Sequence, residues 1–149
     1  MFKPIAIATA ISGTLDIAFA MILTVLFGRE IGNMLRYVGS GPFPAAMDMG
    51  TGGAILGLLV HFALMAIMAS ILMQFVRERP QLLDKPILLG VVYGLITYAV
   101  MNLVVVPLRF DAPLPPSGLS IATQLFAHIV LVGLPMSLVA ARYFGARTA

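Results

Sequence analysis

Four long apolar segments constrain this chain more than any other feature of its sequence. A helix needs ~20 apolar residues to cross the hydrocarbon core of a membrane. Four segments reach this length: residues 5–27, 52–76, 87–107 and 119–141. Only 10% of the 149 residues are charged and 60% are hydrophobic, whereas soluble domains carry ~25% charged residues. The sequence therefore predicts an all-α membrane protein in which residues 1–149 form one domain of four transmembrane helices.

The segments between the apolar runs predict how the helices are connected. Prolines interrupt "RERPQLLDKP" and "PLRFDAPLPPSG", and proline breaks a helix because it lacks a backbone N–H and clashes with the preceding turn. Such short connections place neighbouring spans antiparallel, so we expect a four-helix bundle. The longest connection predicts either a partly ordered loop or a short amphipathic helix lying in the membrane interface. Its apolar residues recur at helical spacing: Ile31, Met34, Leu35 and Val38.

The basic residues predict which side of the membrane each connection faces. One side carries Lys3, Arg77, Arg79, Lys85, Arg142 and Arg147, and the other carries Arg29, Arg36 and Arg109. Cytoplasmic connections carry the excess of lysine and arginine, so we expect both termini in the cytoplasm. The net charge of +3 then reflects membrane topology, and we expect no nucleic-acid partner.

Polar residues within the apolar segments are the candidate functional residues. They are Asp16, His61, Asn102, Gln124 and His128. Such residues are costly in a membrane and usually face a bundle interior or a water-filled cavity. From the rise of a helix, His61 and His128 lie ~14 Å from the outer ends of their helices, Asp16 ~16 Å and Asn102 ~8 Å. We therefore predict one polar cluster in the outer half of the bundle.

Three interpretations of this cluster are open. A structural cluster would tie the helices together through hydrogen bonds of ~0.6–2 kcal/mol each. A functional cluster would use its carboxylate and imidazoles to relay protons or pass a small solute. A cofactor site would use His61 and His128 as haem ligands from two helices. Paired histidines are common without a cofactor, so we expect none.

Small residues at four-residue spacing predict where helices pack closely. Gly53 with Gly57, and Gly90 with Gly94, form such pairs. Pro135 predicts a kink in the fourth span. Small-residue faces could also dock a second copy of the chain or a partner subunit, with membrane lipids around them.

Several enzyme classes have no signature in this chain. It contains no His-Glu-x-x-His, nucleophile elbow, phosphate loop or intramembrane aspartate pair, and the absence of cysteine excludes thiolate ligands. We therefore do not expect an enzyme. Three functions remain open: proton-linked or small-solute transport, an accessory subunit of a larger membrane complex, and a haem- or quinone-binding redox protein.

One motif from each span carries a family resemblance. "SGTLDIAFA", "GGAILGLLVHF", "GVVYGLITYAVMNLVVVPL" and "LFAHIVLVGLP" resemble a group of small four-span bacterial inner-membrane proteins whose function is uncharacterised. The third and fourth spans resemble, more distantly, the YagU-like proteins, which are associated with acid resistance. The resemblance implies a bacterial inner-membrane location and marks Asp16, His61, Asn102 and His128 as motif positions. The chain has Ala127 where the YagU-like motif has glycine.

Overall fold

The computed structural model describes residues 1–145, and within them four helices are long and apolar enough to cross a membrane. These helices are Phe2–Leu26, Gly50–Glu78, Pro86–Phe110 and Gly118–Phe144. The predicted all-α, four-span fold is confirmed, and each boundary lies within three residues of its predicted position. Arg147, one of the basic residues used to predict the orientation, lies outside the described residues.

Two of the spans are uninterrupted α-helices and two contain a π-helical segment. The first two are α1 (Phe2–Leu26) and α3 (Gly50–Glu78). The third comprises α4 (Pro86–Tyr98), the π-helix η3 (Ala99–Val105) and α5 (Val106–Phe110). The fourth comprises α6 (Gly118–Phe126), the π-helix η4 (Ala127–Gly133) and α7 (Leu134–Phe144). The connections contain α2 (Ile31–Ser40) and the 3₁₀ turns η1 (Pro44–Asp48) and η2 (Pro80–Asp84).

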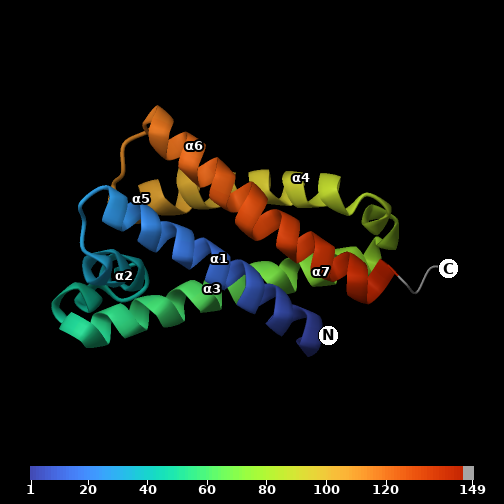
Figure 1. The fold of residues 1–149 in the computed structure, drawn as a ribbon, viewed down its shortest axis with the longest axis horizontal. Helices are drawn as coiled ribbons and strands as arrows, with labels where there is room; N and C mark the ends of the chain where they lie inside the picture. The colour runs from blue at the N-terminus through green and yellow to red at the C-terminus, as the bar shows by residue number, and fades with distance from the viewer. Residues whose placement is uncertain (146–149) are drawn as a thin grey trace.

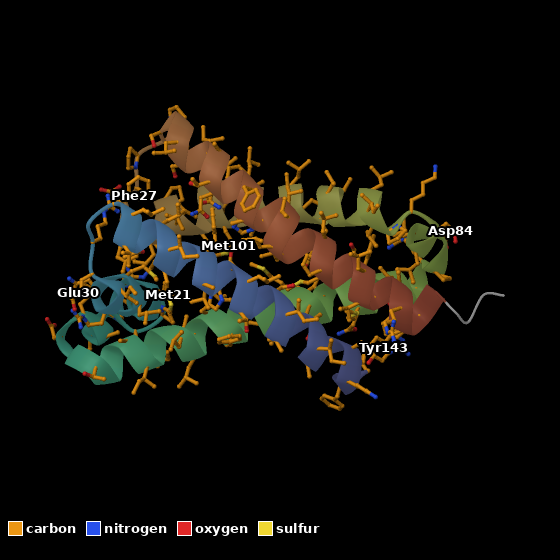
Figure 2. The ribbon with its side chains drawn as sticks, viewed as in Figure 1. Met21, Phe27, Glu30, Asp84, Met101 and Tyr143 are labelled. Atoms are coloured by element: carbon orange, nitrogen blue, oxygen red, sulfur yellow. The ribbon has the colours of Figure 1, made fainter. Side chains whose placement is uncertain are left out.

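Successive spans run antiparallel, so that the start of α1 and the end of α7 lie at one end of the bundle (Figure 1). We call this the inner end, following the predicted orientation, and the end that carries α2 the outer end. Figure 2 shows Phe27 and Glu30 at the outer end and Asp84 and Tyr143 at the inner end. The first span packs against α3, η4 and α7, and α4 packs against η4 and α7.

An apolar core occupies the inner half of the bundle. This core consists of Ala8, Met65, Ala69, Leu72, Met73, Val76, Leu83, Val132, Met136, Val139 and Ala140. On α3 the buried face continues outward through His61, whereas Ile55, Leu59, Ile67 and Ile71 are exposed on the opposite face. One face of the helix therefore packs against protein, and the other is suited to lipid, since lipid tails are as apolar as leucine.

The predicted amphipathic segment is a helix, α2, and it is docked tightly on α3. A Cβ at Gly57 would collide with the carbonyl oxygen of Leu35, so the two backbones touch. Arg109 fixes the C-terminal end of α2, because its Nε and Nη2 donate to the carbonyls of Gly41 and Ser40 at 2.5 and 2.7 Å. These carbonyls lack partners within the helix, and a cation there also complements the helix dipole.

Tyr37 of α2 reinforces this attachment through its ring, which stacks on Phe110 at 4.3 Å between centroids. Burial raises the pKa of the Tyr37 phenol above its ordinary value, and the charge of Arg109 partly offsets this rise. The contacts of Tyr37 and Arg109 thus join the first connection to the outer end of the third span.

Proline positions account for the two π-helical segments. Pro107 and Pro135 are each the second residue of the α-helix that follows a π-helix. A proline inside a helix removes one hydrogen bond and clashes with the carbonyl four residues earlier, and the widened π turn relieves that clash. The predicted disturbance before Pro135 therefore takes the form of η4. The equivalent segment before Pro107 was not predicted.

Candidate functional site

His61 and Asp16 meet between α3 and α1. The imidazole of His61 is buried, and its Nδ1 lies 3.9 Å from Oδ2 of Asp16. Its Nε2 lies 2.9 Å from the carbonyl oxygen of Gly13, one turn earlier on α1. The helices approach closely here because residue 13 is glycine: a Cβ there would lie 2.6 Å from Cε1 of Phe62. The glycine thus exposes the carbonyl that orients the histidine.

The contact with Gly13 determines which nitrogen of His61 carries hydrogen. A carbonyl oxygen only accepts, so Nε2 is the donor. A neutral His61 then presents the lone pair of Nδ1 to Asp16, and an ionised carboxylate would repel that lone pair. One additional proton, on Nδ1 or on the carboxyl group, removes the repulsion. The pair therefore has the geometry of a site for one exchangeable proton, and a movement of ~1 Å would bring the two groups within hydrogen-bonding distance.

His128 is held differently, with both ring nitrogens bonded to uncharged side chains. Its Nδ1 lies 3.1 Å from Oγ1 of Thr97, whose hydroxyl donates to the carbonyl of Gly94 at 3.0 Å. Thr97 therefore accepts, and Nδ1 carries the hydrogen. Nε2 lies 3.2 Å from Nδ2 of Asn102, and that amide also donates to the carbonyl of Tyr98 at 3.4 Å. His128 is thus satisfied as a neutral imidazole.

Four of the five predicted polar residues lie in two separate pairs, Asp16 with His61 and Asn102 with His128. Within residues 1–145, no hydrogen bond or ion pair joins the Asp16–His61 pair to the His128–Asn102 pair. Matching depth did not imply contact, because His61 points from α3 to α1 whereas His128 points from η4 to the third span. Gln124 belongs to neither pair and lines a cavity at the outer end.

Sequence reasoning overlooked two residues that define these pairs. Thr97 was overlooked because apolar residues surround it in the sequence. Its position three residues after Gly94 nevertheless places its hydroxyl near the Gly94 carbonyl. Gly13 was overlooked because its contribution comes from the backbone. Both π-helical segments also matter here, since Asn102 lies in η3 and His128 lies in η4.

The two predicted glycine pairs are buried against different partners. Gly53 and Gly57 pack under η1 and α2, not against another membrane span. Gly90 and Gly94 contact the fourth span, where a Cβ on Gly94 would lie 2.6 Å from the carbonyl oxygen of His128. These faces are therefore not exposed, and the chain itself fills the docking surfaces that the spacing suggested.

The histidine nitrogens that would bind a haem are already engaged. Nε2 of His61 donates to Gly13 and Nε2 of His128 accepts from Asn102, so ligation would require breaking both interactions. Within residues 1–145, no group of three or more His, Cys, Asp or Glu residues is arranged to hold a metal ion.

Comparison with known proteins adds no assignment. No protein-family model, curated protein or solved structure matches the chain. The predicted resemblance to YagU-like proteins therefore stays a prediction, and the geometry of the polar residues is the remaining guide to function.

Proposed function

We propose that this multi-pass membrane protein carries out proton-linked transport, with Asp16 and His61 as its proton-binding site. The observation that carries the proposal is the fixed donor role of His61 Nε2, 2.9 Å from the Gly13 carbonyl. It leaves Nδ1 facing the Asp16 carboxyl group, where one proton can be gained and lost. Ionisable residues that face a bundle interior typically mark ion pathways or proton relays.

The cavity at the outer end supports access to this site from one side. Ala20 lines the cavity and lies four residues, or ~6 Å, above Asp16 on the same face of α1. Below the pair, the apolar core closes the inner half of the bundle. A transport cycle therefore requires a movement that opens the inner half after the proton has bound.

The distribution of charge supports a location in the bacterial inner membrane with both termini cytoplasmic. Arg77, Arg79 and Lys85 flank η2 at the inner end, and cytoplasmic connections are the ones enriched in basic residues. A protein that binds protons from the outer side would suit the acid resistance associated with YagU-like proteins.

Proton flux into proteoliposomes tests the proposal. The purified protein is reconstituted into vesicles that contain a pH-sensitive dye. Proton flux is measured after a membrane potential is imposed across the vesicle membrane, before and after a step in the pH of the outer solution. We expect measurable flux for the unmodified protein and loss of flux for Asp16→Asn, because asparagine has a similar shape but binds no proton in this range.

The matched control is Asp84→Asn, since Asp84 is exposed in η2 at the inner end. This variant should retain full flux. Equal flux from Asp16→Asn and from the unmodified protein would refute the proposal, provided that both elute as folded protein.

A further inference from the structure

The outer cavity lies between α1, α2 and α6 and has a volume of about 370 Å³. Its polar lining includes Thr24, Arg29, Ser120 and Gln124. A second cavity of about 770 Å³ adjoins it and shares Thr24, Arg29 and Met34. Together they form a space large enough for a small solute, and Arg29 lines both parts.

Arg29 provides the uncompensated charge of this space. Its guanidinium makes no hydrogen bond or ion pair within the described part of the chain. The neighbouring Arg36, by contrast, bonds Asn33 and the carbonyl of Gly50 and lies 3.9 Å from Glu30. Glu30 is the carboxylate lining the second cavity, and it also accepts from Asn33 at 3.0 Å. The local acidic charge is therefore already paired, and the guanidinium of Arg29, which is exposed at the mouth of the cavity, is left to attract an anion.

Two neutral donors on α6 complete the arrangement. Ser120 and Gln124 lie one turn apart on the face that lines the cavity. The two threonine hydroxyls of the lining are occupied, because Thr24 donates to the Ala20 carbonyl at 2.7 Å and Thr123 donates to the Leu119 carbonyl at 2.9 Å. The Ser117 hydroxyl accepts from the Ser120 N–H at 3.3 Å. Within residues 1–145, the Ser120 hydroxyl and the Gln124 carboxamide make no hydrogen bond. Their hydrogens are available to a ligand.

We infer that the outer cavity binds a small anion, whose carboxylate or phosphate oxygens are held by Arg29, Ser120 and Gln124. A guanidinium presents parallel N–H donors that match a carboxylate or phosphate, and the hydroxyl and amide supply further hydrogen bonds. The lining of this cavity on α1 begins at Ala20, one helical turn above Asp16, and extends from there to the outer end. Its transport together with a proton rests on the proposed function above, whereas its binding does not.

Binding of acetate and inorganic phosphate to the full-length protein tests the site. Isothermal titration in an uncharged detergent should show saturable binding of at least one of these anions. Arg29→Gln should weaken it about tenfold to a hundredfold, since hydrogen bonds to charged groups are the strong ones. Gln124→Leu should weaken it severalfold. Arg142→Gln is the matched control, because Arg142 is exposed at the inner end, and it should bind as the unmodified protein does.

A second arm distinguishes a free anion from a lipid headgroup. Native mass spectrometry of the protein taken from vesicles of phosphatidylcholine with phosphatidylglycerol should show bound phosphatidylglycerol, lost in Arg29→Gln, if the headgroup is the source. If free anions bind and this binding depends on Arg29, the ligand is a solute. If only the lipid binds and this binding depends on Arg29, the ligand is the headgroup. Absence of both, or binding that Arg29→Gln leaves unchanged, overturns the inference. Asp16→Asn should bind anions as the unmodified protein does. Loss of proton flux in this variant therefore tests the proton site separately from the anion site.

Discussion

Nδ1 of His61 lies 3.9 Å from Oδ2 of Asp16, while Nε2 of the same ring donates to the backbone of Gly13. The backbone contact opposes rotation of the ring, because a flipped ring would lose its hydrogen bond to the Gly13 carbonyl. In the proton-binding site proposed above, a proton shared with Asp16 would therefore stay on one side of the imidazole. Such confinement is what a relay needs, since the donor and acceptor stay aligned as the proton moves.

The first prediction concerns the carboxyl group of Asp16. Infrared difference spectra recorded across a pH titration should contain a band for a protonated carboxylic acid that exchanges with a carboxylate band. Asp16→Asn should remove one such exchanging pair and leave those of the other carboxyl groups, because asparagine cannot ionise. Asp84→Asn should leave the Asp16 pair in place, and its persistence in Asp16→Asn would assign the bands to another residue.

The second prediction distinguishes the two histidines by tautomer. In nitrogen NMR spectra of protein labelled at histidine, His128 should be neutral with hydrogen on Nδ1, because Thr97 accepts there and Asn102 donates to Nε2. His61 should carry hydrogen on Nε2. Thr97→Val should perturb the His128 signals and leave those of His61 unchanged. The same tautomer in both rings would contradict the assigned hydrogen bonds.

The third prediction concerns the packing of α2 on α3. Gly57→Ala should lower the free energy of unfolding by ~1–3 kcal/mol, because its Cβ would collide with the carbonyl of Leu35 and tight packing resists added volume. Reversible unfolding in mixed detergent measures this loss. Gly52→Ala is the control, since the nearest atom to its Cβ is Met49 Cε at 3.9 Å. Equal stability of the two variants would mean that α2 does not stay docked.

The fourth prediction concerns the attachment of α2 by Arg109. Arg109→Ala removes two charge-assisted hydrogen bonds to Ser40 and Gly41, each worth ~1.5–3 kcal/mol. Amide hydrogen exchange over residues 37–43 should therefore accelerate by about tenfold or more. Arg142→Ala should leave exchange in this segment unchanged. Unaltered exchange in Arg109→Ala would show that packing on α3 alone holds the helix.

The sequence by itself determined the fold class. Length and hydropathy placed the four spans, because a membrane requires every backbone polar group to be bonded within a helix. Helical spacing of Ile31, Met34, Leu35 and Val38 likewise indicated a helix as one of two alternatives for this connection, since amphipathic periodicity is a local property, and the structure has the helix α2 there. Both predictions needed no knowledge of which helices are neighbours.

Only the tertiary structure decided how the polar residues are grouped and which faces the glycines occupy. Depth along a helix follows from residue number, but the direction of a side chain relative to a neighbouring helix depends on how the helices pack and cross. His61 and His128 therefore lie at matching predicted depths and still face different partners. A pattern of side chains in the sequence does not reveal the role of a backbone group such as the Gly13 carbonyl. The contact that places a hydrogen on Nε2 of His61 is therefore seen only in the packing of α1 against α3.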